Sequence, residues 1–445
     1  MLKNTSLIIL FIALIVFACS KTEPVGEANN SIQDIDFLKT LGGSLNESGA
    51  SIIKTNDGGY AILGHAQSND IDVSNKPDNS FDYWLLKYNL NHELQWQRTY
   101  GGSDDDRGTD IIQANDGSYA IIGYSKSNDR NITENNGAND FWICKLSSSG
   151  AIVWEKSFGF LGTDNGNAII QTQDNGFLIA GVLDVSASNG QGNSKITGTK
   201  RHAGGDYWAI KLDASGEKQW SKFYGGTFTD TPNDLIQTND NGFLLVGSSD
   251  SNDVDIKNNK GTYDFWIVKI SESGTLIWEK SFGGSQIDEA HAVCDSGDGN
   301  YLIVGDTRSN DFDVTNNNGA ADLWLIKISP EGELIWEQNY GGNSFDVGRS
   351  ISKTVDGGFI ISGSSRSSDG DLTENKGQND AWLLKVNSEG TLLWQKTIGG
   401  SNIDFTYDAV ELNDKSIIAI GETSSNDGDI LTNNGFSDLV IINTK

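Results

Sequence analysis

The chain has little of the chemistry that most enzyme and metal sites use. Its 445 residues include 3 cysteines and 4 histidines, and the histidines are scattered: His65, His92, His202 and His291. There is no Cys-x-x-Cys pair, no Gly-x-Ser-x-Gly, no His-Glu-x-x-His and no phosphate-binding loop. The common hydrolase, metalloprotease and nucleotide-binding signatures are therefore excluded. Acidic residues gathered at the mouth of a channel could still build an active site without such a motif.

Basic residues are also scarce. The chain has 32 Lys and Arg against 61 Asp and Glu, and its formal net charge of −29 is spread along the whole sequence. Binding to a phosphate backbone requires a basic patch, so nucleic acid is excluded as a partner. The acidic surface favours solubility and attracts divalent cations.

Long hydrophobic runs are absent except near the start. Leu7–Phe17 is apolar, follows Lys3 and is too short to span a bilayer, which predicts a signal peptide over residues 1–18. The sequence Val16-Phe17-Ala18-Cys19 resembles a bacterial lipobox, which implies cleavage before Cys19 and attachment of lipid to it. An ordinary secretory signal is the alternative.

Residues 19–33 are polar and predict a flexible tether. Their start, Ser20-Lys21-Thr22-Glu23, looks like the export signals of surface lipoproteins in Bacteroidetes-type bacteria. We therefore expect a lipoprotein of the bacterial cell envelope, held on the outer membrane by its lipid and facing either the periplasm or the outside.

The rest of the chain, residues 34–445, repeats one unit. All 12 tryptophans fall in pairs 12 residues apart, and the pairs recur at intervals of 58, 66, 58, 58 and 58 residues: Trp84/Trp96, Trp142/Trp154, Trp208/Trp220, Trp266/Trp278, Trp324/Trp336 and Trp382/Trp394. Their strict phase indicates a core role rather than sugar stacking.

One unit predicts four strands, at 346–352, 359–363, 380–386 and 391–396, with an Asp-Gly-Gly hairpin turn at 356–358. The third strand is apolar at nearly every position, as in Phe265-Trp266-Ile267-Val268, so both of its faces are covered. Four-stranded sheets stacked face to face around an axis form a β-propeller. Small residues in the first strand, such as Gly108 and Gly348, place that strand innermost.

The number of blades follows from the Asp that opens each third strand: Asp82, Asp140, Asp206, Asp264, Asp322, Asp380 and Asp438. The chain stops after the third strand of the seventh unit, and the missing fourth strand lies at the other end, where 37–43 aligns with 394–400. We therefore predict an all-β, seven-bladed propeller closed by an N-terminal strand that completes the last blade.

The unit resembles the SBBP-type repeats of bacterial seven-bladed propellers. The resemblance rests on its Gly-Gly-Ser-x-x-Asp opening and its closing pattern Lys-x4-Gly-x3-Trp-x4-Gly-Gly, as at 385–400. It implies an extracytoplasmic repeat protein and leaves the chemistry open. The closing pattern also looks like the tryptophan-docking motif of quinoprotein propellers, which we interpret as shared architecture.

Two acidic series are candidate sites. If the first strand is innermost, the acids that open it would ring one mouth of the central channel, either bonding neighbouring blades or holding a cation: Glu47, Asp106, Asp164, Asp230, Asp288, Asp346 and Asp404. Asp-x-Asp pairs in the loops after the second strand offer hard oxygen ligands that suit Ca²⁺, with Asx turns as the alternative: Asp253/Asp255, Asp311/Asp313, Asp369/Asp371 and Asp427/Asp429.

The third unit breaks the pattern. Its loop, 182–205, is longer by eight residues and contains the basic side chains Lys195, Lys200, Arg201 and His202. A basic patch on an acidic ring predicts specific recognition there, and a tolerated surface insertion is the simpler alternative.

Cys144 and Cys294 stand where other units have small apolar residues, so we expect both in the core.

Together these observations favour a non-catalytic scaffold that binds another envelope protein or a glycan. The alternative is a glycan-active hydrolase or lyase with paired carboxylates at the channel mouth.

Overall fold

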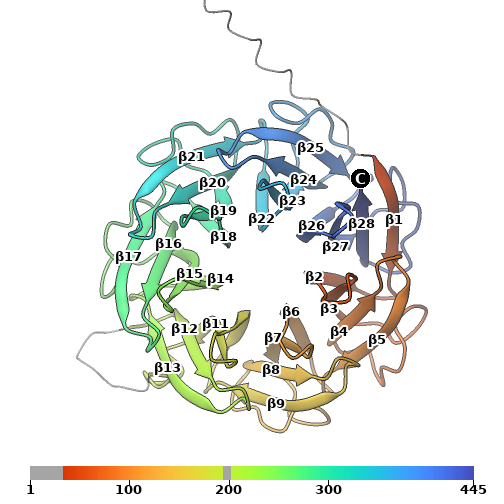
Figure 1. Ribbon diagram of the computed structural model, residues 1–445, viewed down its shortest axis with the longest axis horizontal. Helices are drawn as coiled ribbons and strands as arrows, with labels where there is room; N and C mark the ends of the chain where they lie inside the picture. The colour runs from red at the N-terminus through yellow and green to blue at the C-terminus, as the bar shows by residue number, and fades with distance from the viewer. Residues whose placement is uncertain (1–33, 194–201) are drawn as a thin grey trace, which may run out of the picture.

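The computed structural model describes residues 34–193 and 202–445. These residues form 28 strands in seven four-stranded antiparallel sheets, arranged as blades around a central axis (Figure 1). The all-β, seven-bladed propeller predicted from the repeat is confirmed. The predicted signal peptide and tether lie outside the described residues.

The blades follow one another along the chain. Blade 1 contains β2 (Glu47–Lys54), β3 (Tyr60–Ala66), β4 (Asp82–Tyr88) and β5 (Leu94–Tyr100). Blade 2 contains β6 (Asp106–Gln113), β7 (Tyr119–Ser125), β8 (Asp140–Leu146) and β9 (Ile152–Phe158). Blade 3 contains β10 (Asn165–Gln171), β11 (Phe177–Asp184), β12 (Gly205–Leu212) and β13 (Lys218–Tyr224). Blade 4 contains β14 (Asp230–Gln237), β15 (Phe243–Ser249), β16 (Asp264–Ile270) and β17 (Leu276–Phe282).

The remaining blades repeat this order. Blade 5 contains β18 (Asp288–Asp295), β19 (Tyr301–Thr307), β20 (Asp322–Ile328) and β21 (Leu334–Tyr340). Blade 6 contains β22 (Asp346–Lys353), β23 (Phe359–Ser365), β24 (Asp380–Val386) and β25 (Leu392–Ile398). Blade 7 contains β26 (Asp404–Glu411), β27 (Ile417–Thr423), β28 (Asp438–Thr444) and, from the other end of the chain, β1 (Ile35–Leu41).

The two ends of the chain close the ring. β1 pairs antiparallel with β28, in a register that sets Leu38 opposite Ile442 and Leu41 opposite Leu439. In Figure 1 the first and last strands lie side by side at the outer edge of blade 7. The predicted strand exchange is therefore confirmed, and it removes the open sheet edge that blade 7 would otherwise present.

The first strand of each blade is innermost, as the small residues indicated (Figure 1). A Cβ added to Gly348 would lie 2.7 Å from Val304 Cγ2 and 2.9 Å from Leu323 Cγ in the preceding blade. Blades converge toward the axis, so a side chain at Gly348 would collide with blade 5, although blades 4, 5 and 7 accommodate Pro232, Ala290 and Thr406 at the same register.

The third strand of each blade forms the core. Trp266 and Trp324 are fully buried, and each packs against an aromatic side chain of the preceding blade, Tyr207 and Phe265 respectively. Cys144 is also buried, whereas Cys294 is partly exposed. The tryptophans belong to the packing between blades, as their phase predicted.

The second tryptophan of a pair contacts a hairpin turn of the next blade. In blade 4, Trp278 is half-buried and donates its indole N–H to the carbonyl oxygen of Pro330, 3.2 Å away in the turn of blade 5. A Cβ on Gly332 in that turn would lie 2.9 Å from the Trp278 ring. The turn glycine therefore lets the hairpin of one blade rest on the outer strand of its neighbour.

The lysine of each third strand pairs with the hairpin-turn aspartate of its own blade. Lys327 Nζ lies 2.8 Å from Asp298 Oδ2, and Lys211 Nζ lies 2.8 Å from Asp174 Oδ2. Blade 7 has Asn443 instead of this lysine, and Lys445 makes the pair with Asp414 at 3.4 Å. The repeated Asp and Lys therefore serve the fold.

The ring has two chemically different faces. We call the linker face the end that carries the linkers between blades (for example 341–345) and the long loops after each second strand (for example 308–321). We call the turn face the end that carries the short hairpins, such as 354–358 and 387–391. No helix in 34–193 or 202–445 is long and apolar enough to cross a membrane.

Removing residues 34–41 tests the strand exchange. This deletion takes away Leu41, which is buried, and Phe37 and Leu38, which pack against the core of blades 1 and 7. Because each buried apolar side chain contributes roughly 1.5–3 kcal/mol, we expect the free energy of unfolding to fall by roughly 3–6 kcal/mol in a urea titration. A peptide spanning 34–43, added in trans, should restore part of it, and an unchanged midpoint would contradict the role of β1.

Candidate functional site

The acids that open the first strands do not line the channel mouth. Glu47, Asp106 and Asp346 are fully buried, as are their four counterparts Asp164, Asp230, Asp288 and Asp404. Asp346 Oδ2 accepts hydrogen bonds from the amide of Gly342 at 2.8 Å and from the Ser367 hydroxyl at 2.7 Å. The predicted acidic ring at the mouth is thus wrong in its exposure, because the linker and the loop of the blade cover these side chains.

The acids that open the third strands face the same linkers. Asp322 Oδ2 accepts a hydrogen bond from the Asn318 amide, whereas its Oδ1 is buried and has no hydrogen-bond partner. A Cβ on Gly341 would lie 2.7 Å from Asp322 Oδ1 and 2.8 Å from Asp346 Oδ2. The first glycine of the linker thus runs between two buried carboxylates, and this arrangement repeats around the ring.

Burial raises the pKa of these carboxyl groups. The pKa of Asp322 rises to about 7, because burial is reinforced by the charges of Asp346 and Asp371. Burial likewise raises the pKa of Asp264 to about 7, where the charge of Lys260 opposes the shift. Two carboxylates across one glycine cannot both ionise without repulsion, so the junctions take up protons near neutral pH.

The Asp-x-Asp loops hold the linker backbone. Asp311 Oδ1 accepts the amide of Ser285 at 2.7 Å, and Asp313 Oδ2 accepts the amide of Gly283 at 3.2 Å. Asp427 and Asp429 bind the amides of Ser401 and Gly399 in the same way. These bonds reach linkers 26 to 30 residues away in the sequence, so they are not the local Asx turns considered as the alternative for these pairs.

Calcium binding by these loops stays a prediction. In the described part of the chain, no three His, Cys, Asp or Glu side chains already form a group that could hold a metal ion. The first aspartate of each pair is exposed, although both oxygens of Asp253 and of Asp369 already accept hydrogen bonds from the linker residues Thr227 and Asn343.

The basic patch in the long loop of blade 3 is only partly described. Lys195, Lys200 and Arg201 lie outside the described residues. His202 is not on the open surface: its Nδ1 lies 2.6 Å from Asp206 Oδ2, its Nε2 lies 4.0 Å from Asp255 Oδ2, and its ring packs edge-on against Phe223. These contacts tie His202 to the junction between blades 3 and 4, and its role in recognition stays a prediction.

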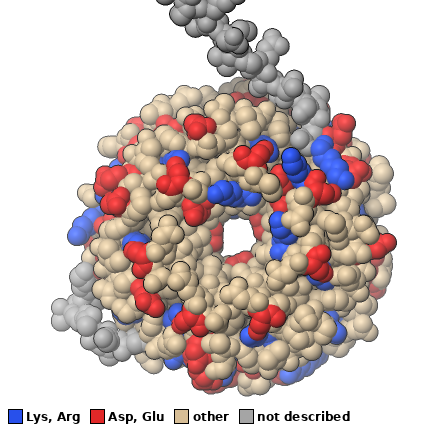
Figure 2. All heavy atoms as spheres, in the orientation of Figure 1, with Lys and Arg blue, Asp and Glu red and all other residues tan. Residues whose placement is uncertain are grey.

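Three aspartates that sequence reasoning missed face the channel. Asp110, Asp234 and Asp408 are half-buried on the innermost strands, and Figure 2 shows acidic atoms on the channel wall. Asp110 and Asp408 accept the amides of Ile169 and Ile52 in the following blades, at 2.8 and 2.9 Å. The signal was present: the equivalent positions are Ser or Ala in the other four blades, Ser51, Ala168, Ala292 and Ser350.

Burial raises the pKa of Asp234 to about 8, and the charges of Asp110 and Asp408 contribute from other blades. The pKa values of Asp110 and Asp408 rise to about 6, mainly through burial as well. Blades 2, 4 and 7 thus each contribute one inner-strand carboxyl group of raised pKa, and each of these groups also accepts a hydrogen bond from a neighbouring inner strand.

Of the 15 large apolar side chains that are exposed among the described residues, seven lie on the linker face, two lie in hairpins of the turn face, and six lie on the outer strands: Leu94, Ile152, Val153, Ile277, Leu334 and Ile335. Ile71 and Phe312 are 65% and 69% exposed, and both stand between the two aspartates of an Asp-x-Asp loop. Five more exposed apolar residues belong to loops or linkers of the same face: Leu161, Phe228, Phe345, Leu431 and Phe436. The turn face has only Leu90 and Val355 of this kind in its described hairpins.

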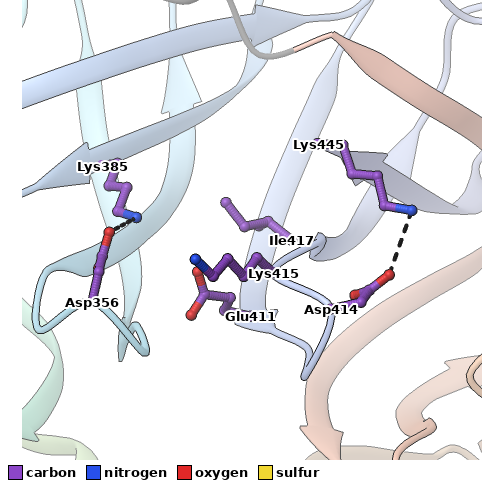
Figure 3. Close-up of a pocket in the computed structure, with 7 residues that line it drawn as sticks. All are labelled: Asp356, Lys385, Glu411, Asp414, Lys415, Ile417 and Lys445. Carbon is purple, nitrogen blue, oxygen red and sulfur yellow. Dashed lines mark hydrogen bonds and ion pairs between the residues drawn. The ribbon is translucent and has the colours of Figure 1, made fainter.

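The turn face has charged clefts between blades. The cleft between blades 6 and 7 has a volume of about 320 Å³ and contains two ion pairs, Lys385 with Asp356 and Lys445 with Asp414 (Figure 3). Glu411 and Lys415 lie between these pairs. Another cleft of about 430 Å³ opens at the boundary of blades 4 and 5. We attribute these clefts to the spacing of the hairpins, since they recur at the same place in the repeat.

No protein-family model matches the chain. The regulatory protein FlaEY of Caulobacter vibrioides is 20% identical over 407 residues, which cover 82% of this chain and 41% of that protein. The chain thus spans less than half the length of this curated relative.

Two solved structures are similar to the chain, and the likeness to the first supports the fold. Raptor from Chaetomium thermophilum matches with a TM-score of 0.50 at 8% identity, over 93% of this chain and 29% of that one. Sqt1 from the same organism matches with a TM-score of 0.46 at 10% identity, over 92% and 99% of the two chains. At such identities the similarity shows the fold alone.

The buried junctions predict how stability depends on pH. Asp322 has a folded-state pKa of about 7 against an ordinary value of 3.8, so the folded chain binds this proton more tightly than the unfolded chain. We therefore expect the urea midpoint, measured with a chelator present, to fall as the pH rises from about 5 to about 8.

Two variants separate the titration of Asp322 from that of the other charged groups in the chain. Asp322→Asn removes one carboxyl group whose pKa is raised, so the urea midpoint of this variant should fall less steeply with pH. Asp298→Asn is the control, because hydrogen bonds from Lys327 and Ser296 hold the pKa of Asp298 well below its usual range and it titrates outside this window. A midpoint that rises toward alkaline pH would contradict the assignment.

Proposed function

We propose that the protein is a lipid-anchored scaffold of the bacterial outer membrane or cell surface that binds another envelope protein through its linker face. The exposed apolar side chains on that face are the observation that supports this proposal. They are flanked by acidic loops, while the opposite face pairs most of its charges within each blade.

Ile71 and Phe312 are held outward at a cost to the backbone. Their φ angles are 55° and 54°, in the left-handed region that β-branched and bulky residues rarely adopt. Blades 6 and 7 have Gly370 and Gly428 at the same loop position, where that conformation is easily reached. Strained residues of this kind cluster at functional sites, and solvent-exposed apolar tips have no packing role within the ring.

The surroundings indicate the chemistry of the partner. Asp70 beside Ile71 and Asp311 beside Phe312 are exposed carboxylates. A complementary surface has apolar pockets for the tips and Lys or Arg around them, which is the usual arrangement of a protein interface. A glycan offers neither positive charge nor deep apolar pockets, so a protein partner is favoured.

The predicted lipid anchor bears on the accessibility of this face. β1 begins at the turn face and runs to the linker face, so a tether that ends at Asp34 joins the ring on the turn face. With lipid on Cys19, the point of attachment is nearer the turn face, which leaves the linker face accessible to a partner. The relation to SBBP-type repeats and to Bacteroidetes-type surface lipoproteins belongs to the same proposal.

The second candidate function is a glycan-active enzyme that uses Asp110, Asp234 and Asp408 in the channel. Raised pKa values suit a general acid. Against this, all three side chains accept hydrogen bonds from backbone amides, which explains their presence without catalysis. Release of reducing sugar that disappears in Asp234→Asn would favour the enzyme.

Pull-down of the native lipoprotein tests the scaffold. We expect a co-purifying envelope protein whose recovery falls at least about tenfold in the Ile71→Glu/Phe312→Glu variant, because buried charge in the centre of an interface is strongly unfavourable. Ile277→Glu/Ile335→Glu changes two exposed residues of the outer strands and serves as the matched control. Equal loss in both variants, or recovery of the protein alone together with binding to a glycan array, would contradict the proposal.

A Cys19→Ser variant tests the anchor. Without the thiol no thioether lipid can form, so we expect loss of fatty-acid labelling and a shift of the protein from the detergent-soluble membrane fraction to the soluble fraction. Labelling retained in this variant would place the lipid elsewhere.

A further inference from the structure

Three carboxylates surround the first glycine of several linkers. Around Gly341 they come from three elements: Asp322 from the third strand of blade 5, Asp346 from the first strand of blade 6, and Asp371 from the loop of blade 6. Asp371 Oδ2 accepts the Gly341 amide at 3.0 Å. Glu47, Asp72 and Asp438 surround Gly42 in the same way at the junction of blades 7 and 1.

Two of the equivalent junctions contain a lysine ammonium. Between blades 4 and 5, Lys260 Nζ lies 2.7 Å from Asp313 Oδ2 and donates to the Ser281 carbonyl oxygen at 2.8 Å. Between blades 6 and 7, Lys376 Nζ lies 3.0 Å from Asp429 Oδ2 and 3.4 Å from the Thr397 carbonyl oxygen. His202 takes the same place between blades 3 and 4, beside Asp206 and Asp255.

Three junctions have asparagine there instead: Asn136 between blades 2 and 3, Asn318 between blades 5 and 6, and Asn434 between blades 7 and 1. The loop of blade 3 has no Asp-x-Asp pair, so only the last two junctions contain the full set of three acids. Among the described residues, no Lys, Arg or His forms an ion pair with any of their six acids, which are Asp322, Asp346, Asp371, Glu47, Asp72 and Asp438. Asp322 and Asp438 are fully buried, and the Oδ1 atom of each lacks a hydrogen-bond partner, as does Oδ1 of Asp264 and Asp380 in the two lysine junctions. What sets the two junctions apart is therefore the missing ammonium group.

We propose that these two junctions bind a hard cation, Ca²⁺ above all, in the place that Lys260 Nζ and Lys376 Nζ occupy in their sister junctions. Carboxylate and carbonyl oxygens are the ligands that Ca²⁺ prefers. In the lysine junctions the ammonium groups contact the carbonyl oxygens of Ser281 and Thr397 on the outer strand. Asn339 and Thr40 occupy the same register in the two lysine-free junctions, so their carbonyl oxygens are available to the ion. The described carboxylates do not yet form a three-ligand group, so the ion draws the free oxygens together as it binds.

The consequence is that the contact between the blades at these two junctions depends on a bound cation. The junction of blades 7 and 1 lies beside the strand exchange that closes the ring, and an ion there would add to that closure. This inference is independent of the proposed binding partner, because it concerns only the joints between blades.

Thermal unfolding of the full chain, stripped with EDTA and returned to neutral pH, tests the proposal. We expect millimolar CaCl₂ to raise the midpoint by several degrees in a saturable way, KCl at the same ionic strength to have a much smaller effect, and dialysis to show about two bound Ca²⁺ per chain. No bound calcium and no shift would overturn the proposal.

The chain supplies its own matched control. Asn318→Lys/Asn434→Lys copies the sister junctions, so this variant should be more stable than the wild type in EDTA and gain nothing from CaCl₂. Lys260→Asn/Lys376→Asn is the reverse change and should enlarge the calcium response. If the calcium shift persists in the asparagine-to-lysine variant, the ion binds elsewhere and the proposal fails.

A proton is the competing neutraliser. If acidification stabilises the wild type while CaCl₂ has no effect, the buried carboxyl groups are neutralised by protons alone and no cation site exists. Should a variant fail to fold, the calcium content of the wild-type protein decides the question by itself.

Discussion

Everything in this ring depends on how the chain passes from the outer edge of one blade to the inner edge of the next. The linker crosses the end of the sheet with its amides facing inward, and each amide needs an acceptor. Acidic side chains from the first strand, the third strand and the long loop supply these acceptors, and they leave room for glycine alone at the first linker position. The blade spacing, the burial of the acids and the shape of the linker face all follow from this joint.

The repeat predicted the fold because each unit contains its own strand signals. Asp-Gly turns, an apolar third strand and paired tryptophans placed the strands to within one or two residues, and the split copy at the ends predicted the closure through β1 and β28. Such signals are local in the chain or repeat at a fixed interval. The positions of Gly348 and Trp278 were predictable for the same reason.

Exposure was harder to predict. The acids such as Asp346 were expected at a channel mouth because the first strand is innermost, but that expectation ignored the linker that folds over them. His202 was interpreted as a surface base, although its partners Asp206 and Asp255 come from a strand and from the next blade. Asp110, Asp234 and Asp408 were missed because they break the repeat in only three of its units, and a search for regularity passes over them.

The two faces show how one repeated unit produces two unlike surfaces. On the turn face, lysine and aspartate of each blade neutralise each other, as Lys327 and Asp298 do. On the linker face, the acids are either buried in the joints or left exposed beside apolar tips such as Phe312. The repeated unit therefore pairs its charges on the turn face and leaves unpaired acids and exposed apolar side chains on the linker face.

The closure through β1 has a consequence for how the protein is made. β1 is the first strand of the ring to leave the ribosome or an export channel, yet its only partner, β28, is the last. Six complete blades can form while that strand waits unpaired, and blade 7 can join only when the end of the chain arrives. A chain that is cut short near its C-terminus lacks β28, so β1 and β27 both lose the strand that joins them. The open ring then has two unpaired strands, which can pair with another molecule instead of closing one ring.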